Sequence, residues 1–197
     1  MSSPVFTAEL PPARWLYRTR AAAVLWLVVR LALGWGWLSA GWHKITGPDS
    51  RAWMDGGTAL QGFVKGAIAQ SHGKNPDVAY SWYVDFLHWV CANAAPMAKL
   101  VAVAEVAVGI MLITGCLTGL AALAGATMNL NYMLAGSAGV NPVFLLAAFL
   151  LMLAWRNAGW IGLDRYLLPR LLRRNTHPGD PGPNQPAPVR AKQPAAV

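Results

Sequence analysis

The chain has 197 residues, of which 55% are hydrophobic and only 12% are charged. Soluble globular domains carry about 25% charged residues, so this composition excludes an ordinary soluble protein and favours one that is embedded in lipid. The formal net charge of +8 comes mostly from basic residues near the two ends of the chain. Membrane orientation and anionic lipid account for such residues, so no nucleic-acid partner is expected.

Four apolar segments are predicted to span the membrane. They comprise residues 21–41, 97–117, 119–137 and 142–156. A transmembrane helix needs about 20 apolar residues, and no Asp, Glu, Lys or Arg occurs in the fifty residues from Val106 to Trp155. The predicted fold is therefore all-α. It is an integral membrane four-helix bundle formed by residues 21–169, with an outer amphipathic helical segment, residues 42–96, between the first and second spans.

The distribution of basic residues predicts the orientation of these spans. Three arginines precede the first span and five follow the fourth. An even number of spans places both ends on one side, and the positive-inside rule makes that side the cytoplasmic face of the plasma membrane. Residues 1–20 are then a cytoplasmic tail. The Pro-rich residues 175–197, with almost no large apolar side chain, are expected to form a disordered cytoplasmic tail.

The outer segment is too apolar to be a flexible loop. Within it, Asp77, Ser81, Asp85 and His88 recur at spacings of four, four and three residues, with aromatic residues between them. This pattern predicts a helix with a thin polar stripe, which lies on the membrane or caps the bundle.

Neither a disulfide nor a metal site is expected. Cys91 precedes the second span and Cys116 ends it, so about 30 Å of bilayer should separate them. His43 and His88 do not have the ligand spacing that a metal or haem site needs.

Two charges inside the apolar segments are the strongest indication of function. Arg30 lies about 14 Å from the cytoplasmic end of the first span, and Glu105 lies about 12 Å from the outer end of the second. These depths agree within the reach of an arginine side chain, and an isolated charge so deep costs a few kcal/mol or more. We therefore expect Arg30 and Glu105 to pair. The pair is either a salt bridge that docks two helices or part of a buried ligand or proton site.

Other polar and aromatic residues are expected near this pair. Asn129 and Asn131 lie near the middle of the third span, but they point about 200° apart, so only one can face the charged pair. Helix–helix hydrogen bonding explains the asparagines equally well. Tyr132 shares a face with Asn129, and Trp37 lies on the charged face of the first span, where a flat aromatic ligand could stack. His43, at the outer interface, could accept a proton because histidine titrates near neutral pH.

Four stretches are informative through their order and spacing. They read LALGWGWLSAGWHKITGP after Arg30, AEVAVGIMLITGCLTGLAA around Glu105, NLNYMLAGSAGVNP and AWRNAGWIGLDRYLLP. Together they resemble the DoxX/DoxD family of four-span membrane proteins, over about residues 21–169. The long outer segment is more similar to the DoxD branch, the large subunit of a thiosulfate:quinone oxidoreductase.

The resemblance implies a membrane subunit that oxidises thiosulfate or another reduced sulfur species and is linked to the quinone pool. The family-matching positions in this chain are Arg30, Glu105, Asn129, Asn131 and Asp164. Asp164 is expected to cap a helix or to pair with a neighbouring arginine.

Three functions are compatible with these features. The first is a quinone-linked oxidoreductase subunit, which takes electrons from a sulfur or thiol donor or through a redox partner subunit. In it, Arg30 would polarise a quinone carbonyl oxygen, and Glu105 or His43 would move a proton. The alternative is a non-catalytic scaffold that recruits a redox or detoxifying enzyme to the bilayer, and the third function is an anion transporter. A homo-oligomer is compatible with each. The residues expected to bind the quinone are Trp37, Asn129, Asn131 and Tyr132.

Overall fold

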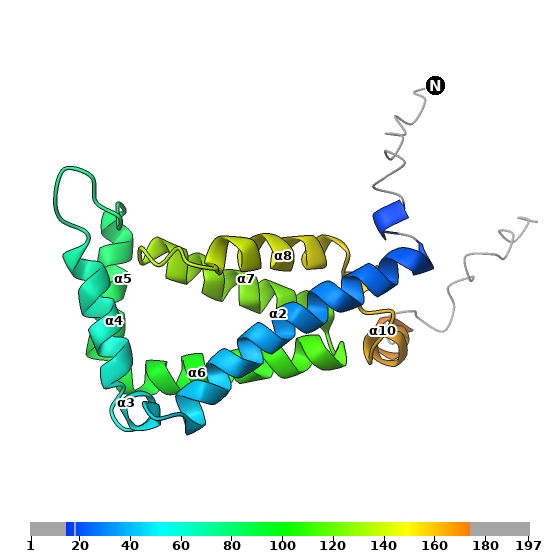
Figure 1. Ribbon diagram of the computed structural model, residues 1–197, viewed down its shortest axis with the longest axis horizontal. Coiled ribbons are helices and arrows are strands. Elements are labelled where there is room, and N and C mark those ends of the chain that lie inside the picture. The colour runs from blue at the N-terminus through cyan, green and yellow to red at the C-terminus, as the bar shows by residue number, and fades with distance from the viewer. Residues whose placement is uncertain (1–14, 18, 174–197) are drawn as a thin grey trace, which may run out of the picture.

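The computed structural model describes residues 15–17 and 19–173, and within these ranges it contains helices and no strand (Figure 1). The predicted all-α fold is therefore confirmed for this part of the chain. The disordered tail predicted for residues 175–197 and most of the predicted N-terminal tail lie outside the described residues.

Four helices lie where the sequence predicts spans. They are α2 (Arg20–Thr46), α6 (Ala94–Thr114), α7 (Thr118–Leu134) and α8 (Asn141–Leu153). α2 and α6 are each long and apolar enough to cross a membrane, and α8 is apolar but shorter. α2 continues to Thr46, beyond the predicted end at Gly41. This extension changes which residues of α2 and α6 face each other.

Local sequence signals set several helix ends. Thr19 caps α2, because its side-chain oxygen accepts a hydrogen bond from the Ala22 N–H over 3.3 Å. α6 ends at Gly115, whose φ of +68° lies in the left-handed region that favours glycine. Pro142 lies in the first turn of α8, where the missing N–H leaves no helical hydrogen bond unmade.

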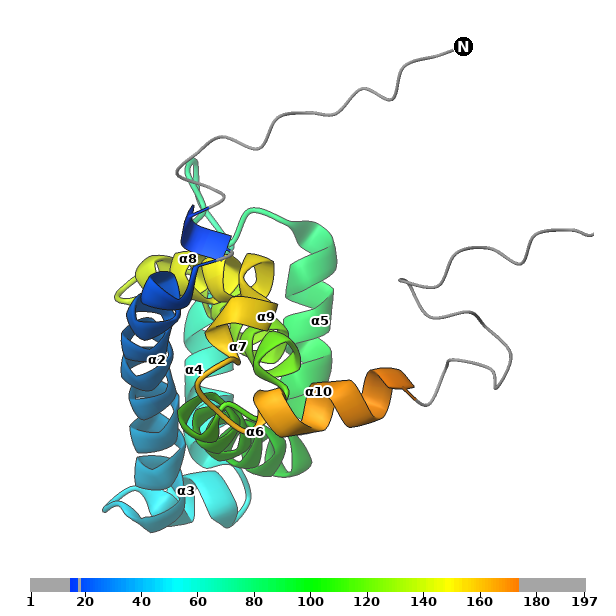
Figure 2. The same cartoon turned by 90° about the vertical axis from the view of Figure 1, so that its right-hand side faces the viewer.

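The four helices pack against one another in pairs. α2 packs along α6 and α7 packs along α8, while α6 also contacts α7 and α2 also contacts α8. Figure 2 shows this arrangement from the end at which α2 begins. Their shared core is rich in alanine, and its two buried tryptophans, Trp26 and Trp37, come from α2. Small side chains let the helices approach closely.

Glycines set the register between α2 and α6. A Cβ atom on Gly109 would lie 2.5 Å from the backbone nitrogen of Leu38, and one on Gly41 would lie 2.7 Å from the backbone nitrogen of Val106. Any larger residue at either position would push the backbones apart. The same contacts place Gly41 beside Glu105, so the last turns of α2 lie against the middle of α6.

Shorter helices cover the two ends of this assembly. α3 (Ser50–Met54), α4 (Thr58–Ala69) and α5 (Ser81–Ala92) lie at one end, where α4 and α5 run across the ends of the longer helices (Figure 1). α9 (Trp155–Ala158) and α10 (Asp164–Arg173) lie at the opposite end, where α9 contacts α2 and α10 begins beside the end of α6 (Figures 1 and 2).

The predicted outer helix corresponds to α5, which is amphipathic. Its side chains Tyr83, Leu87 and Val90 are buried in a second apolar cluster, which is shared with α4 and α6. Asp85 is exposed on the opposite side. Asp77, which the polar stripe included, precedes the helix. The predicted helix is therefore confirmed, but it begins at Ser81 and not at Asp77, the first residue of the polar stripe.

Candidate functional site

The pairing of Arg30 with Glu105 predicted from the sequence is wrong. Glu105 lies beside Gly41 of α2, whereas Arg30 lies beside Gly115 at the end of α6. Arg30 and Gly41 are separated by eleven residues of α2, which places the two charges about 16 Å apart along the helix axis. The prediction took the start of the first span as level with the end of the second, whereas Arg30 itself lies level with the end of α6, so it placed the two helices in the wrong register.

Arg30 instead joins three elements at the end where α2 begins. Its Nη1 donates to the Ala158 carbonyl oxygen over 2.9 Å, and its Nη2 donates to the Ile161 carbonyl oxygen over 2.6 Å. The Asp164 carboxylate is close enough to act electrostatically on the guanidinium. Both side chains are buried.

Asp164 also caps α7. Its two carboxylate oxygens accept hydrogen bonds from the Leu117 N–H over 2.6 Å and the Thr118 N–H over 2.8 Å. A carboxylate at a helix N-terminus satisfies free N–H groups and interacts favourably with the helix dipole. The capping role expected for Asp164 is confirmed. With Arg30 it forms a structural cluster that fixes α2, α7 and the turn before α10.

Glu105 binds Lys44 and Tyr132. Lys44 Nζ lies 2.6 Å from Glu105 Oε2, and the Tyr132 hydroxyl donates to Glu105 Oε1 over 2.7 Å. The carboxylate side chain is only 2% exposed. The Lys44 ammonium also lies 4.9 Å from the centroid of the Trp53 ring. Helices α2, α6 and α7 therefore each supply one member of a hydrogen-bonded triad, Lys44–Glu105–Tyr132, in which Glu105 is buried and the other two are partly exposed.

Lys44 is the site residue that the sequence prediction missed. It follows Trp37 by seven residues and Arg30 by fourteen, so all three lie on one face of α2. The prediction assigned Lys44 to the outer segment because it ended the helix too early. Extending the helical periodicity of the first span by one turn would have placed Lys44 on the buried face.

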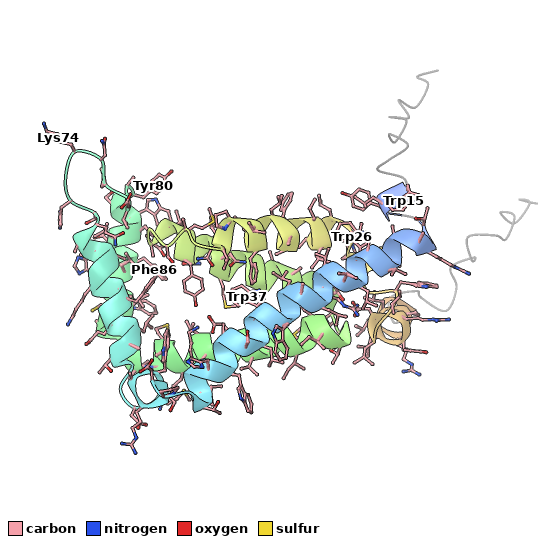
Figure 3. All side chains as sticks on the ribbon, viewed as in Figure 1. Trp15, Trp26, Trp37, Lys74, Tyr80 and Phe86 are labelled. Atoms are coloured by element: carbon pink, nitrogen blue, oxygen red, sulfur yellow. The ribbon has the colours of Figure 1, made fainter. Side chains whose placement is uncertain are left out.

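A cavity of about 370 Å³ adjoins the triad, and Lys44, Glu105 and Tyr132 are part of its wall. The rest of the wall is largely apolar, with contributions from α2, α4, α7 and α8. Trp37 and Phe144 meet there edge to face with their ring centroids 6.3 Å apart, and Figure 3 shows Trp37 between α2 and the α7–α8 pair. An apolar cavity of this size with a few converging polar groups is typical of a small-molecule site.

Two polar side chains in the cavity wall have no hydrogen-bond partner in the described part of the chain. Both the Nδ2 and the Oδ1 of Asn129 are unpaired, as is the Nε1 of Trp37. Asn129 is 0% exposed and Trp37 is 3% exposed. Leaving such a buried group unpaired costs about 1–3 kcal/mol. Both residues belong to the cavity wall, where they hold two donors and one acceptor that the described part of the chain leaves unpaired.

The remaining predicted site residues lie outside this cavity. His43 is exposed, and it borders a shallow surface hollow with Trp35 and Ile110. The Asn131 side chain donates to the Thr127 carbonyl oxygen of its own helix over 2.9 Å. Asn129 is therefore the asparagine that faces the cavity, in agreement with the expectation that only one of the two could do so.

The described residues hold no group of three or more His, Cys, Asp and Glu side chains that could bind a metal ion. Cys91 and Cys116 are both free thiols, as their predicted separation requires.

Comparison with known proteins gives one positive result. No curated protein and no solved structure matches this chain. The family model described as DoxX matches residues 25–138, which is more than half of the chain and includes Arg30, the triad and Asn129. The chain therefore belongs to the DoxX family, and with its two long apolar helices it has the features of a membrane protein of this family.

Proposed function

We propose that this chain is a four-span plasma-membrane subunit of a quinone-linked oxidoreductase that oxidises thiosulfate or another reduced sulfur or thiol donor. The cavity beside the Lys44–Glu105–Tyr132 triad holds the quinone headgroup. This assignment moves the quinone site away from Arg30 to the end of the assembly that α4 and α5 cover.

The arrangement of the helices supports four spans with both termini in the cytoplasm. Arginines gather at the end where α2 begins and where α9 and α10 lie, as the positive-inside rule requires of a cytoplasmic face. At the other end, Trp82, Phe86 and Trp89 of α5 are exposed. Exposed aromatic side chains on a helix that crosses the bundle end fit the headgroup layer of the outer leaflet.

The observation that carries the proposal is that the Asn129 amide and the Trp37 indole N–H, in the wall of a largely apolar cavity, have no partner in the described part of the chain. A quinone headgroup is flat and apolar except for two carbonyl oxygens, and each of these oxygens accepts hydrogen bonds. Asn129 Nδ2 and Trp37 Nε1 would donate to one carbonyl, while the aromatic wall holds the ring. The site would thereby satisfy its own buried donors on binding.

The triad supplies the proton chemistry of this proposal. Reduction of a quinone to a quinol consumes two electrons and two protons. With thiosulfate as donor, two thiosulfate ions join through a new S–S bond to give tetrathionate and release the two electrons. Lys44 and Tyr132 both carry protons and both bind Glu105. Glu105 can therefore pass protons toward the cavity and be reloaded from the outer end.

Binding and turnover test the proposal separately. The full chain in lipid nanodiscs is titrated with a benzoquinone, and quinol formation is then followed after addition of thiosulfate, with and without co-purified partners. Asn129→Leu should weaken quinone binding about tenfold, which corresponds to 1.4 kcal/mol. The matched control is Thr127→Val, because the Thr127 hydroxyl binds its own helix, at the Leu123 carbonyl oxygen. Equal affinities in wild type and Asn129→Leu would refute the assignment of the cavity.

A scaffold is the second candidate, and the exposed aromatic face of α5 is the feature that favours it. In this case Trp82, Phe86 and Trp89 would dock a soluble redox enzyme and not lipid. The scaffold predicts that a partner protein co-purifies with wild type and with Asn129→Leu but not with Trp82→Ser. This result, together with no quinone binding by wild type, would support the scaffold over the oxidoreductase.

A further inference from the structure

A second cavity lies directly beside the quinone cavity. It has a volume of about 220 Å³ and lies between α4, α5, α6 and α7. Its wall is almost entirely apolar and includes Leu87, Met97, Val101 and Met128. This cavity contains no charged side chain, so it suits a hydrocarbon group and not a polar headgroup.

The two cavities share a wall. Leu60, Phe63 and Tyr132 line both of them, and the Phe63 and Tyr132 rings meet edge to face with centroids 6.1 Å apart. The Tyr132 hydroxyl binds Glu105 at the polar cavity, while its ring also borders the apolar one. A single molecule with a polar headgroup and an apolar tail would therefore contact both sides of Tyr132.

The apolar cavity also reaches the surface. Phe86 of α5 borders it and is 40% exposed, and Figure 3 shows Phe86 on the α4–α5 layer that faces the longer helices. Asn131 of α7 borders it as well. Beside it, the Tyr83 hydroxyl donates to the Asn131 carbonyl oxygen over 2.7 Å and ties α5 to α7, so the exposed edge of this cavity is the one that Phe86 forms.

From this arrangement we infer that the natural ligand carries a linear alkyl or isoprenoid tail, which occupies the apolar cavity while the headgroup occupies the polar one. The ligand reaches the site laterally from the membrane, past the partly exposed Phe86 of α5. The inference rests on the proposed function, and it specifies the substrate class as a long-tailed quinone, which should bind more tightly than a tailless quinone with the same headgroup.

The test compares two ligands with one headgroup. The full chain in nanodiscs of constant lipid composition is titrated with a methoxy-substituted benzoquinone that has no side chain, and with its decyl derivative. Val101→Trp fills the apolar cavity from α6. The control is Leu100→Trp, because Leu100 is the preceding residue and is 58% exposed, outside the cavity. Both variants are titrated in nanodiscs of the same lipid. The decyl compound therefore partitions equally into the lipid in the two titrations, and partitioning does not affect the comparison of their affinities.

In wild type and Leu100→Trp, both compounds should bind. In Val101→Trp, the decyl compound should lose at least tenfold in affinity while the tailless compound keeps its wild-type affinity. Met128→Trp, which fills the same cavity from α7, should repeat this result and covers the case in which Val101→Trp does not fold, as judged by size-exclusion chromatography.

The outcomes distinguish the two proposals. If both compounds bind wild type and the preference for the decyl compound is unchanged in the two cavity-filling variants, the tail site is refuted and the headgroup site stands. If neither compound binds wild type, the proposed function is refuted and the tail site with it.

Discussion

Replacing Lys44 with methionine removes the positive charge that neutralises Glu105 and keeps a side chain of similar length. The carboxylate is 2% exposed and the ammonium 17% exposed, with 2.6 Å between Lys44 Nζ and Glu105 Oε2. Removing one partner of a buried ion pair costs about 3–5 kcal/mol, because it leaves an uncompensated charge. Lys44 is partly exposed and Tyr132 still donates to the carboxylate, so we expect a loss at the lower end, about 3 kcal/mol.

A double-mutant cycle measures this pair. The free energy of unfolding is determined in mixed micelles for Lys44→Met, Glu105→Gln and the double variant. Because Glu105→Gln removes the charge that Lys44 compensates, the double variant should lose less than the sum of the single losses, by about 1–3 kcal/mol. Lys65→Met is the matched control. Lys65 is exposed on α4, and its replacement should change the stability by no more than about 0.5 kcal/mol.

A second cycle separates this structure from the pairing expected from the sequence. Arg30 binds the carbonyl oxygens of Ala158 and Ile161, so Arg30→Met and Glu105→Gln should be additive. Coupling between Arg30 and Glu105, together with additive effects of Lys44 and Glu105, would refute the register of α2 against α6 described above.

Three further predictions concern backbone contacts and pH. Gly109→Ala should destabilise the fold by about 1–3 kcal/mol, because the new Cβ would meet the α2 backbone. Gly66 of α4 has open space around it, so Gly66→Ala should stabilise the fold by about 0.5–1 kcal/mol in the same unfolding assay. Gly115→Ala should cost about 1–2 kcal/mol for its left-handed φ alone, and more because its Cβ would touch the Arg30 guanidinium. Burial raises the pKa of Tyr83 to about 12 from 10.0, so its contribution to stability is complete below pH 10 and is lost as the pH rises through 12. Tyr83→Phe should make the loss of stability between pH 10 and 12 less steep. An unchanged slope would contradict the attribution of this loss to the ionisation of Tyr83.

Much of the secondary structure follows from local sequence signals. Uncharged apolar runs predicted helices at the positions of α2, α6, α7 and α8, and the polar stripe predicted α5. Propensity, capping and hydrophobic periodicity act within about one or two helical turns, so a single sequence contains them. The predicted end of α2 is too early, because His43 and Lys44 resemble the polar edge of a membrane span. The helix continues past them to Thr46, in contact with α3.

Relations within one helix were also predictable. Tyr132 was expected on the face of Asn129, and both residues line the cavity. Helical geometry alone required that Asn129 and Asn131 point apart, and Asn131 binds its own helix. The relation between α2 and α6 was not predictable in this way, because it depends on Gly41 and Gly109 fitting against another backbone. Lys44 follows Arg30 by fourteen residues, which is about four turns of α2, and this difference in register exchanges the partner of Glu105 from Arg30 to Lys44.

The property that marks the cavity as a site could not have been read from the sequence at all. An unpaired amide is defined by the absence of a partner on every neighbouring helix, and Asn129 meets this condition only once α2, α6, α7 and α8 are all in place. The same packing that buries Arg30 gives its Nη1 and Nη2 carbonyl partners and leaves only its Nε unpaired, whereas the Asn129 amide and the Trp37 indole N–H have no partner among the described residues. From the sequence alone, the structural role of Arg30 could not be told apart from the cavity-lining role of Asn129 and Trp37. The structure separates them, because both terminal nitrogens of the Arg30 guanidinium have carbonyl partners within the protein, whereas Asn129 and Trp37 belong to the wall of a cavity that a ligand could fill.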